Sequence, residues 1–225
     1  CSSDLEVENF PELMERDWVA VKFKTASEYA KKLRGSMPDI SYFSYRRAFD
    51  RNILTSSLRT VHTELSRARF SATPPGETEL VSRFHKLDPN GVCNTLRAGT
   101  NSDRGAFTSP RPIHPHTPRC ITVREAARLH SYPDWFRFHV TKWHGFRQIG
   151  NSVPPLLGQS VAERIIAALE IQAAVPERVL ELGDPSLLSF NMAAAANYFA
   201  VPENTIAKRE RTSDRIAREL QGSLW

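Results

Sequence analysis

Arginine side chains in an irregular stretch of this 225-residue sequence have the chemistry needed to contact a polyanion. The stretch "VCNTLRAGTNSDRGAFTSPRP" is rich in Ser, Thr and Asn and contains Arg97, Arg104 and Arg111. An arginine can bind the O6 and N7 atoms of guanine in the major groove, whereas a phosphate contact only positions the protein. These three arginines are therefore candidates for contact with a polyanion, with base or phosphate contact left open for each if that polyanion is a nucleic acid.

Positive charge is concentrated in the middle of the chain. The net charge is +5 and the isoelectric point is about 9.3. Between residues 43 and 72 there are six arginines but only two acidic residues, Asp50 and Glu64. A solvated basic face is one interpretation, but the abundance of Ser, Thr and Asn favours a surface that faces phosphates.

Other chemistries have little support in the sequence. Three cysteines, Cys1, Cys93 and Cys120, are too few and too scattered for a disulfide framework, so we expect a reducing cytosol. The histidines and cysteines show no C-x-x-C pair or regular spacing, which predicts no metal site. No apolar run reaches the length of a membrane span. Because the chain begins with Cys1, we expect a processed, truncated or fragmentary sequence.

The first third of the chain predicts a strand and a helix, followed by loops. Residues 18–24 alternate apolar and polar side chains as a half-buried strand does. Thr25 and Glu28 have the spacing of a capping box, and Gly35 would end the helix that follows. Turn-forming residues then dominate to about residue 118, with short strand-like pieces at 81–87 and 92–98.

Two helices are predicted after residue 121. Thr122 and Glu125 form a second capping-box pair, so 123–131 is expected to be a helix that stops before Pro133. A longer helix starts at Pro154-Pro155, with Gln159, Glu163 and Arg164 expected to face outward. Its apolar stripe must be buried against something, and consists of Leu157, Val161, Ile165 and Leu169.

The C-terminal tail predicts a pair of helices after a linker at 184–188. Residues 189–220 have the pattern of helix, tight turn and helix, with Pro202 at the start of the second helix. Such a unit could place its second helix in a major groove. An amphipathic hairpin packed on the body fits the pattern as well, so both interpretations stay open.

Residues 119–169 resemble the last two conserved blocks of the DNA cytosine-5 methyltransferases. The first block is "RCITVREAARLHSYPDWFRF", and the second is "FRQIGNSVPP" running into its helix. Thr95-Leu96 also lies where the family's target-recognition region commonly has a Thr-Leu pair. The resemblance thus makes Thr95, Arg97, Arg104 and Arg111 candidates for DNA contact. The resemblance extends, less specifically, to about residue 45.

The resemblance implies an α/β fold. The chain would be the C-terminal portion of an S-adenosylmethionine-dependent methyltransferase, with an irregular α+β target-recognition domain and an α-helical tail. The implied segments are a strand-helix segment (1–44), the target-recognition region (45–118), the return to the methyltransferase domain (119–172) and a helix-turn-helix-like tail (186–225). By the same resemblance, Arg124, Glu125 and Arg128 hold these parts together, while Tyr132, Pro133, Trp135 and Phe136 belong to the core.

The residues that carry the family's catalysis are missing from the sequence. The family uses a Cys in Pro-Cys-Gln to attack C6 of a flipped-out cytosine, a Glu in Glu-Asn-Val, and a Gly-rich loop for S-adenosylmethionine. None of these motifs occurs here, so we expect no catalytic residue in this chain. The resemblance implies a partner, the catalytic N-terminal half or subunit of the same enzyme, and double-stranded DNA as substrate.

The resemblance also assigns Asn151, Ser152 and Val153 to the cofactor pocket. A structural alternative is that Ser152 caps the helix that begins at Pro154-Pro155. The sequence therefore predicts the target-recognition and cofactor-completing half of a bacterial restriction–modification methyltransferase, inactive alone, acting in the cytoplasm at the nucleoid. The rival hypothesis is a non-catalytic DNA-binding protein or regulator, which would cover the apolar stripe of its own long helix.

Overall fold

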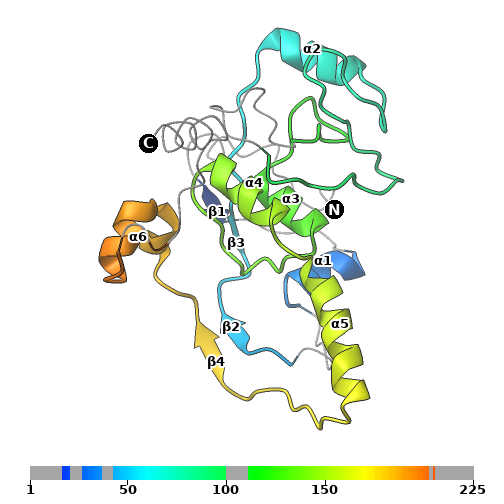
Figure 1. Cartoon of the computed structure of the whole chain (residues 1–225). Coiled ribbons are helices and arrows are strands. Elements are labelled where there is room, and N and C mark those ends of the chain that lie inside the picture. The colour runs from blue at the N-terminus through cyan, green and yellow to red at the C-terminus, as the bar shows by residue number, and fades with distance from the viewer. Residues whose placement is uncertain (1–16, 21–26, 37–42, 100–110, 203–204, 206–225) are drawn as a thin grey trace, which may run out of the picture. The chain divides into compact units, whose positions relative to one another are not determined.

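The computed structural model describes residues 17–20, 27–36, 43–99, 111–202 and 205. The chain divides into two compact units, Cys1–Asp184 and Pro185–Trp225. In the first unit, the elements in chain order (Figure 1) are β1 (Trp18–Ala20), α1 (Glu28–Leu33), β2 (Arg46–Ala48), β3 (Ile53–Thr55), α2 (Glu64–Ala72), α3 (Val123–Leu129), α4 (Lys142–Gly150), α5 (Pro155–Ala168) and β4 (Val179–Glu181).

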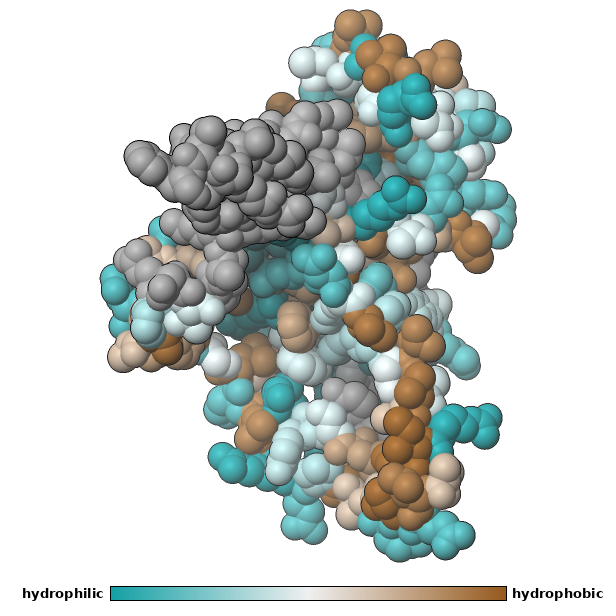
Figure 2. All heavy atoms as spheres, in the orientation of Figure 1, coloured by the Kyte–Doolittle hydropathy of each residue, from teal (hydrophilic) through white to brown (hydrophobic). Residues whose placement is uncertain are grey.

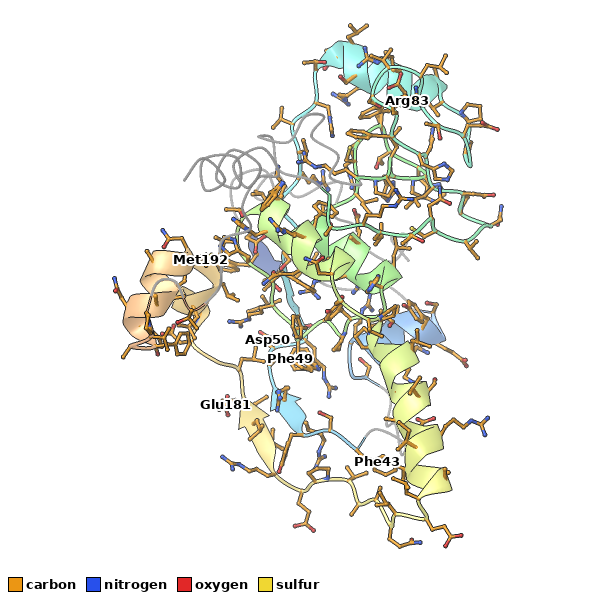
Figure 3. The ribbon with its side chains drawn as sticks, viewed as in Figure 1. Phe43, Phe49, Asp50, Arg83, Glu181 and Met192 are labelled. Carbon is orange, nitrogen blue, oxygen red and sulfur yellow. The ribbon has the colours of Figure 1, made fainter. Side chains whose placement is uncertain are left out.

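The described strands pair into two small sheets. β1 and β3 are antiparallel, with Trp18 opposite Thr55. β2 and β4 are parallel, with Ala48 opposite Glu181, which Figure 3 labels on β4. Mixed helix and strand content thus agrees with the predicted α/β class, and segments far apart in the sequence form both sheets.

The main core of the first unit lies around α3 and α4. The two helices pack so closely that a Cβ at Gly145 of α4 would lie 2.8 Å from Cγ1 of Val123 in α3. Glycine is therefore required at this contact. The buried residues of this core are Leu87, Leu96, Ile121, Val123, Ala126, Ala127, Phe138, Phe146 and Ile149.

Helix α3 is buried on every side, including its charged residues. The predicted capping box is confirmed, because the Thr122 hydroxyl accepts from the Glu125 N–H and the Glu125 carboxylate accepts from the Thr122 N–H. Six consecutive residues, Val123 to Arg128, are buried. Because an unpaired buried charge is very costly, each charged side chain needs a partner.

Arg124 joins α3 to strand β3 and to the aromatic turn after the helix. Its guanidinium donates to the Thr55 carbonyl at 3.0 Å and to the Phe136 carbonyl at 2.7 Å. Its backbone N–H donates to the Ser56 carbonyl at 2.7 Å. Burial lowers the pKa of Arg124 to about 10, so the group stays charged near neutral pH. This arginine is structural, as expected.

Two further buried ion pairs fix the ends of α3. Arg119 binds both carboxylate oxygens of Glu125 at 2.9 Å, and Arg128 binds Asp134 at 2.6 and 3.0 Å. Burial raises the pKa of Glu125, but the Arg119 guanidinium more than offsets this and holds that pKa at about 2. Glu125 therefore stays ionised throughout the neutral range.

Helix α2 is a finding that the sequence did not predict. It starts at the Thr63 cap and buries only Phe70, so it lacks the apolar stripe that would have indicated a helix. Lys86 ties this helix to the following loop, because its buried ammonium donates to the carbonyls of Phe70 and Thr73 at 3.0 and 2.8 Å. Cations at a helix C-terminus are favourable because they neutralise its free carbonyls.

Helix α5 has its apolar stripe in solvent. The helix begins at Pro155 as predicted, and no residue of it is buried. Figure 2 shows apolar side chains gathered along α5. The stripe residues are each 51–64% exposed: Leu157, Val161, Ile165 and Leu169.

The prediction that Gln159 and Glu163 face outward is wrong. These two polar side chains are half-buried and hydrogen-bonded to each other at 3.0 Å. Arg164 is exposed, as expected. Leu156 and Ile166 are half-buried on the same side as Gln159 and Glu163, so the side of α5 that faces the described part of the protein is mixed, while the stripe faces away.

Several other local predictions need correction. The cap of α1 is Ser27, whose hydroxyl accepts from the Ala30 N–H, while Thr25 lies outside the described residues. Gly35 ends this helix at a φ of 63°, as expected. Residues 81–87 form only isolated bridges and 92–98 form no strand. Tyr132 and Phe136 are half-buried and pack against the main core, as predicted. Pro133 and Trp135 are only half-buried, and the fully buried aromatic of that turn is Phe138.

The second unit starts with a 3₁₀ helix, Pro185–Ser189, where the sequence predicted a linker. Helix α6 (Met192–Tyr198) follows, with Asn191 as its cap. Ala200 adopts a φ of 51° at the predicted turn, and the second predicted helix lies outside the described residues. No helix among the described residues combines the length and apolarity needed to cross a membrane.

Substituting Glu125→Gln is expected to destabilise the chain by about 3 kcal/mol at pH 7, because it leaves the buried Arg119 guanidinium without its anion. The contribution of the pair is complete above the unfolded pKa of about 4.5 and is lost as the pH falls toward 2. Urea denaturation across this range should show the difference shrinking. Glu64→Gln, in an exposed pair with Arg67, is the control and should change little. An equal effect of both substitutions would contradict the account.

Candidate functional site

The residues predicted to meet the cofactor form a short loop between α4 and α5. Asn151 is the C-cap of α4 and is exposed, and its side-chain amide makes no hydrogen bond to the described part of the chain. Val153 is 65% exposed. The loop therefore presents an amide and an apolar side chain to the outside, directly before α5.

The structural alternative for Ser152 is wrong. Its hydroxyl donates backward to the Ile149 carbonyl at 2.7 Å, and the N-cap of α5 is Pro154, which offers no side-chain acceptor. The Leu156 N–H in the first turn of α5 instead donates to the Ser131 hydroxyl oxygen at 3.1 Å. Ser131 belongs to the turn after α3, so this cap comes from elsewhere in the sequence.

Gly150 lies against the segment that carries the candidate DNA contacts. A Cβ at this position would overlap the Ala98 nitrogen and the Arg97 carbonyl group. Backbone atoms cannot yield as the end of a flexible side chain can, so glycine is required here. The segment "NTLRA" and the loop "GNSV" are thereby brought into direct contact, which the sequence did not reveal.

The candidate DNA contacts fall into three groups. Thr95 and Arg97 are exposed, while Leu96 between them is buried in the main core and anchors them. Arg111 is half-buried, and burial lowers its pKa. Arg104 lies outside the described residues.

Arg111 belongs to a basic cluster that the sequence did not predict, comprising His62, Arg111 and Lys142 around Cys120. The His62 Nε2 accepts from the Cys120 N–H at 3.2 Å, and Lys142 donates to the Arg59 carbonyl at 2.8 Å. Burial lowers the pKa of His62, and Lys142 and Arg111 lower it further. Burial and Arg111 likewise lower the pKa of Lys142. Such a cluster would be stabilised by an anion.

Neither described cysteine is suited to act as a nucleophile. Burial raises the pKa of Cys120 to about 12, and it raises the pKa of Cys93 as well. A reactive cysteine requires a lowered pKa, since the thiolate is the nucleophile. Among the described residues, no three His, Cys, Asp or Glu side chains gather where they could hold one metal ion.

Comparison with known proteins identifies the relatives of this chain. A family model described as "C-5 cytosine-specific DNA methylase" matches residues 8–167. This match includes the N-terminal segment, where the sequence alone indicated resemblance only from about residue 45. The Type II methyltransferase M.XorII of Xanthomonas oryzae pv. oryzae is 62% identical over 212 residues, which are 94% of this chain and 50% of that protein.

Other relatives match shorter parts. The Type II methyltransferase M.AgeI of Thalassovita gelatinovora is 53% identical over 88 residues, 39% of this chain and 19% of that protein. The crystal structure of a putative DNA modification methyltransferase encoded within an Escherichia coli prophage aligns with a TM-score of 0.55 and 38% identity. It covers 69% of this chain and 41% of that one. The chain spans about half the length of M.XorII and less of the others.

The contact at Gly150 predicts a contrast between two glycines. Gly150→Ala should displace the Arg97–Ala98 backbone and lower the free energy of unfolding by about 2 kcal/mol or more, as overpacking does. Gly158→Ala, in α5 with nothing within 4 Å, should raise it by up to about 1 kcal/mol because alanine favours helix. Urea denaturation of both variants checks this, and a neutral Gly150→Ala would refute the close contact.

Proposed function

Because this chain belongs to the C-5 cytosine-specific DNA methylase family, we propose that it is the target-recognition and cofactor-completing half of such an enzyme. With its catalytic half, it would transfer a methyl group from S-adenosylmethionine to C5 of cytosine in duplex DNA. Relatives named as Type II methyltransferases support a role in a restriction–modification system. The catalytic half is the part of a longer family member, such as M.XorII, to which this chain does not align.

The exposed apolar stripe of α5 carries this proposal. Four large apolar side chains on one stripe are more than half exposed, although burying each one fully is worth roughly 1.5–3 kcal/mol. Exposed apolar patches of this kind mark interaction sites. A self-sufficient DNA-binding protein would have covered the stripe, so the exposed stripe favours a half that docks its catalytic partner through α5.

The properties of the cysteines also support assigning the catalytic nucleophile to the other half. The two described cysteines have raised pKa values, and none of the three cysteines stands in Pro-Cys-Gln. The covalent attack on C6 that makes C5 nucleophilic must therefore come from the catalytic half. We expect this chain alone to bind DNA weakly and to methylate nothing.

Asn151, Ser152 and Val153 fit a role beside the cofactor. S-adenosylmethionine supplies an electrophilic methyl group to enzymes of this family. The exposed Asn151 amide can hydrogen-bond a polar ligand, and Val153 offers an apolar contact next to it. The Ser152 hydroxyl is already used within the loop, so its contribution would be to hold the loop in shape.

Thr95, Arg97, Arg104 and Arg111 are the proposed DNA contacts. Exposure of Thr95 and Arg97 beside the buried Leu96 supports contacts from a fixed backbone. Arg111 and Lys142 lie in the same basic cluster, which supports a position near phosphate. The family's requirement for a flipped-out base makes such positioning contacts necessary.

A tritium-transfer assay tests the proposal. Unmethylated genomic DNA and labelled S-adenosylmethionine are incubated with the chain, with the part of M.XorII that it does not match, and with both. Incorporation into 5-methylcytosine with both polypeptides only is the expected result. Incorporation by the chain alone would overturn the proposal. No incorporation with both, together with tight salt-dependent DNA binding by the chain, would favour a non-catalytic binding protein.

The double substitution Val161→Glu/Ile165→Glu should reduce methyl transfer by the two halves at least about tenfold at limiting concentration, because it introduces charge into the apolar contact. Both positions are exposed in the chain, so its own melting temperature should stay unchanged. Ala167→Glu is the matched control, exposed but about 200° around the helix from Ile165. Equal activity of the two variants would exclude docking through the stripe.

Substituting Arg97→Ala should weaken specific DNA binding by the two halves about tenfold if Arg97 reads a base. If it contacts phosphate, binding to all sequences should weaken and the salt dependence should fall by about one counterion. Lys31→Ala, an exposed charge on α1, is the control. Fluorescence anisotropy at several salt concentrations distinguishes the cases, and an unchanged affinity at every salt concentration would remove Arg97 from the interface.

A further inference from the structure

Ser131 adopts an unusual backbone conformation in a buried turn. Its φ is 63°, in the left-handed region that favours glycine, and the residue is 7% exposed. A non-glycine residue held in this region costs roughly 1 kcal/mol or more and persists only where its surroundings require it. A serine at this position therefore points to a use for its hydroxyl group.

The hydroxyl of Ser131 supplies the missing cap of α5. Pro154 makes no side-chain cap, and the Leu156 N–H donates to Ser131 Oγ at 3.1 Å. The preceding residue contacts the same loop, because His130 Nε2 lies 3.1 Å from the Ser152 carbonyl oxygen. When Nε2 carries the proton it donates this hydrogen bond. His130 thus contacts the residue before Val153, and Ser131 contacts Leu156, which follows it in the first turn of α5.

The turn is itself fixed to the buried helix α3. The Ser131 N–H donates to the Arg128 carbonyl at 3.0 Å, and the Tyr29 hydroxyl donates to the same carbonyl at 2.6 Å. The His130 ring stacks on Tyr132 at 6.2 Å between centroids. The Ser131 hydroxyl and the His130 ring, which reach the loop, are therefore held by contacts to the buried helix α3 and to Tyr132.

We infer that Ser131 and His130 are positioning residues that fix the loop Asn151–Val153 in the conformation that receives the cofactor. This inference rests on the proposed function, since it concerns the same loop. Ser131 acts by holding the first turn of α5, and His130 acts by holding the Ser152 carbonyl. Neither residue needs to touch the cofactor or the reacting atoms.

Three substitutions at Ser131 separate backbone strain from the hydrogen bond. Ser131→Gly removes the acceptor and relieves the strain, so the chain should melt at the same temperature or higher. Ser131→Ala removes the acceptor and keeps the strain. Ser131→Asn keeps a side-chain oxygen and tolerates the left-handed conformation, so it is the expected rescue. Ser160→Ala is the control, because Ser160 donates only to the Leu156 carbonyl within α5.

The first readout is hydrogen exchange of the full chain without cofactor. Exchange of the peptide containing Leu156 should be about tenfold faster in Ser131→Gly and Ser131→Ala, as loss of a helix cap predicts. Ser131→Asn and Ser160→Ala should exchange as the unaltered chain does. Unchanged exchange in Ser131→Gly would show that the hydroxyl does not hold the loop.

The second readout is calorimetric binding of S-adenosylhomocysteine, the demethylated cofactor, to the two assembled halves. Ser131→Gly should raise its Kd about tenfold, with the Kd for DNA unchanged and restored cofactor binding in Ser131→Asn. Equal weakening of cofactor and DNA binding would mean a general structural role and would overturn the inference. If the unaltered assembly binds no cofactor, the proposed function fails; if it binds and Ser131→Gly matches it, only this inference fails.

Discussion

The buried charges of α3 impose the constraint on which the first unit depends. Arg124, Glu125 and Arg128 lie on a seven-residue helix that is enclosed on every side, and each must find a partner of opposite charge or a set of carbonyl groups. The partners come from β3, from Arg119 just before the helix and from the aromatic turn after it. Satisfying these groups fixes the distant strand β3 and the two segments that flank α3 around one short helix.

The proposed site depends on this arrangement at two contacts. Gly150 brings the end of α4 against the Arg97–Ala98 backbone, and Ser131 joins the end of α3 to the start of α5. The candidate DNA contacts and the candidate cofactor loop are therefore both held in place by contacts to the same core. Helix α5 leaves that core with its apolar stripe exposed.

Local sequence signals predicted the helices that have their own caps and periodicity. The capping box of Thr122 and Glu125 and the Pro-Pro start of α5 were sufficient for α3 and α5. Helix α2 was missed because it buries only Phe70, and α4 was not predicted as a separate helix. The contacts of Gly150 and Ser131 could not be predicted, since they join residues about 25 to 50 positions apart in the sequence. Gln159 and Glu163 of α5 were predicted to face outward but are half-buried, because periodicity gives a stripe but not the direction in which the rest of the helix points.

Hydroxyl-radical footprinting of the chain, alone and with the catalytic half, tests the central claim most directly. The account predicts that Leu157, Val161, Ile165 and Leu169 are labelled readily in the chain alone, in accordance with their exposure of 51–64%, and are protected in the assembly. Labelling of the exposed Val92, outside the proposed contact, provides the internal reference. A stripe already protected in the isolated chain, or labelled equally in an assembly that methylates DNA, would contradict the claim that α5 docks the catalytic half.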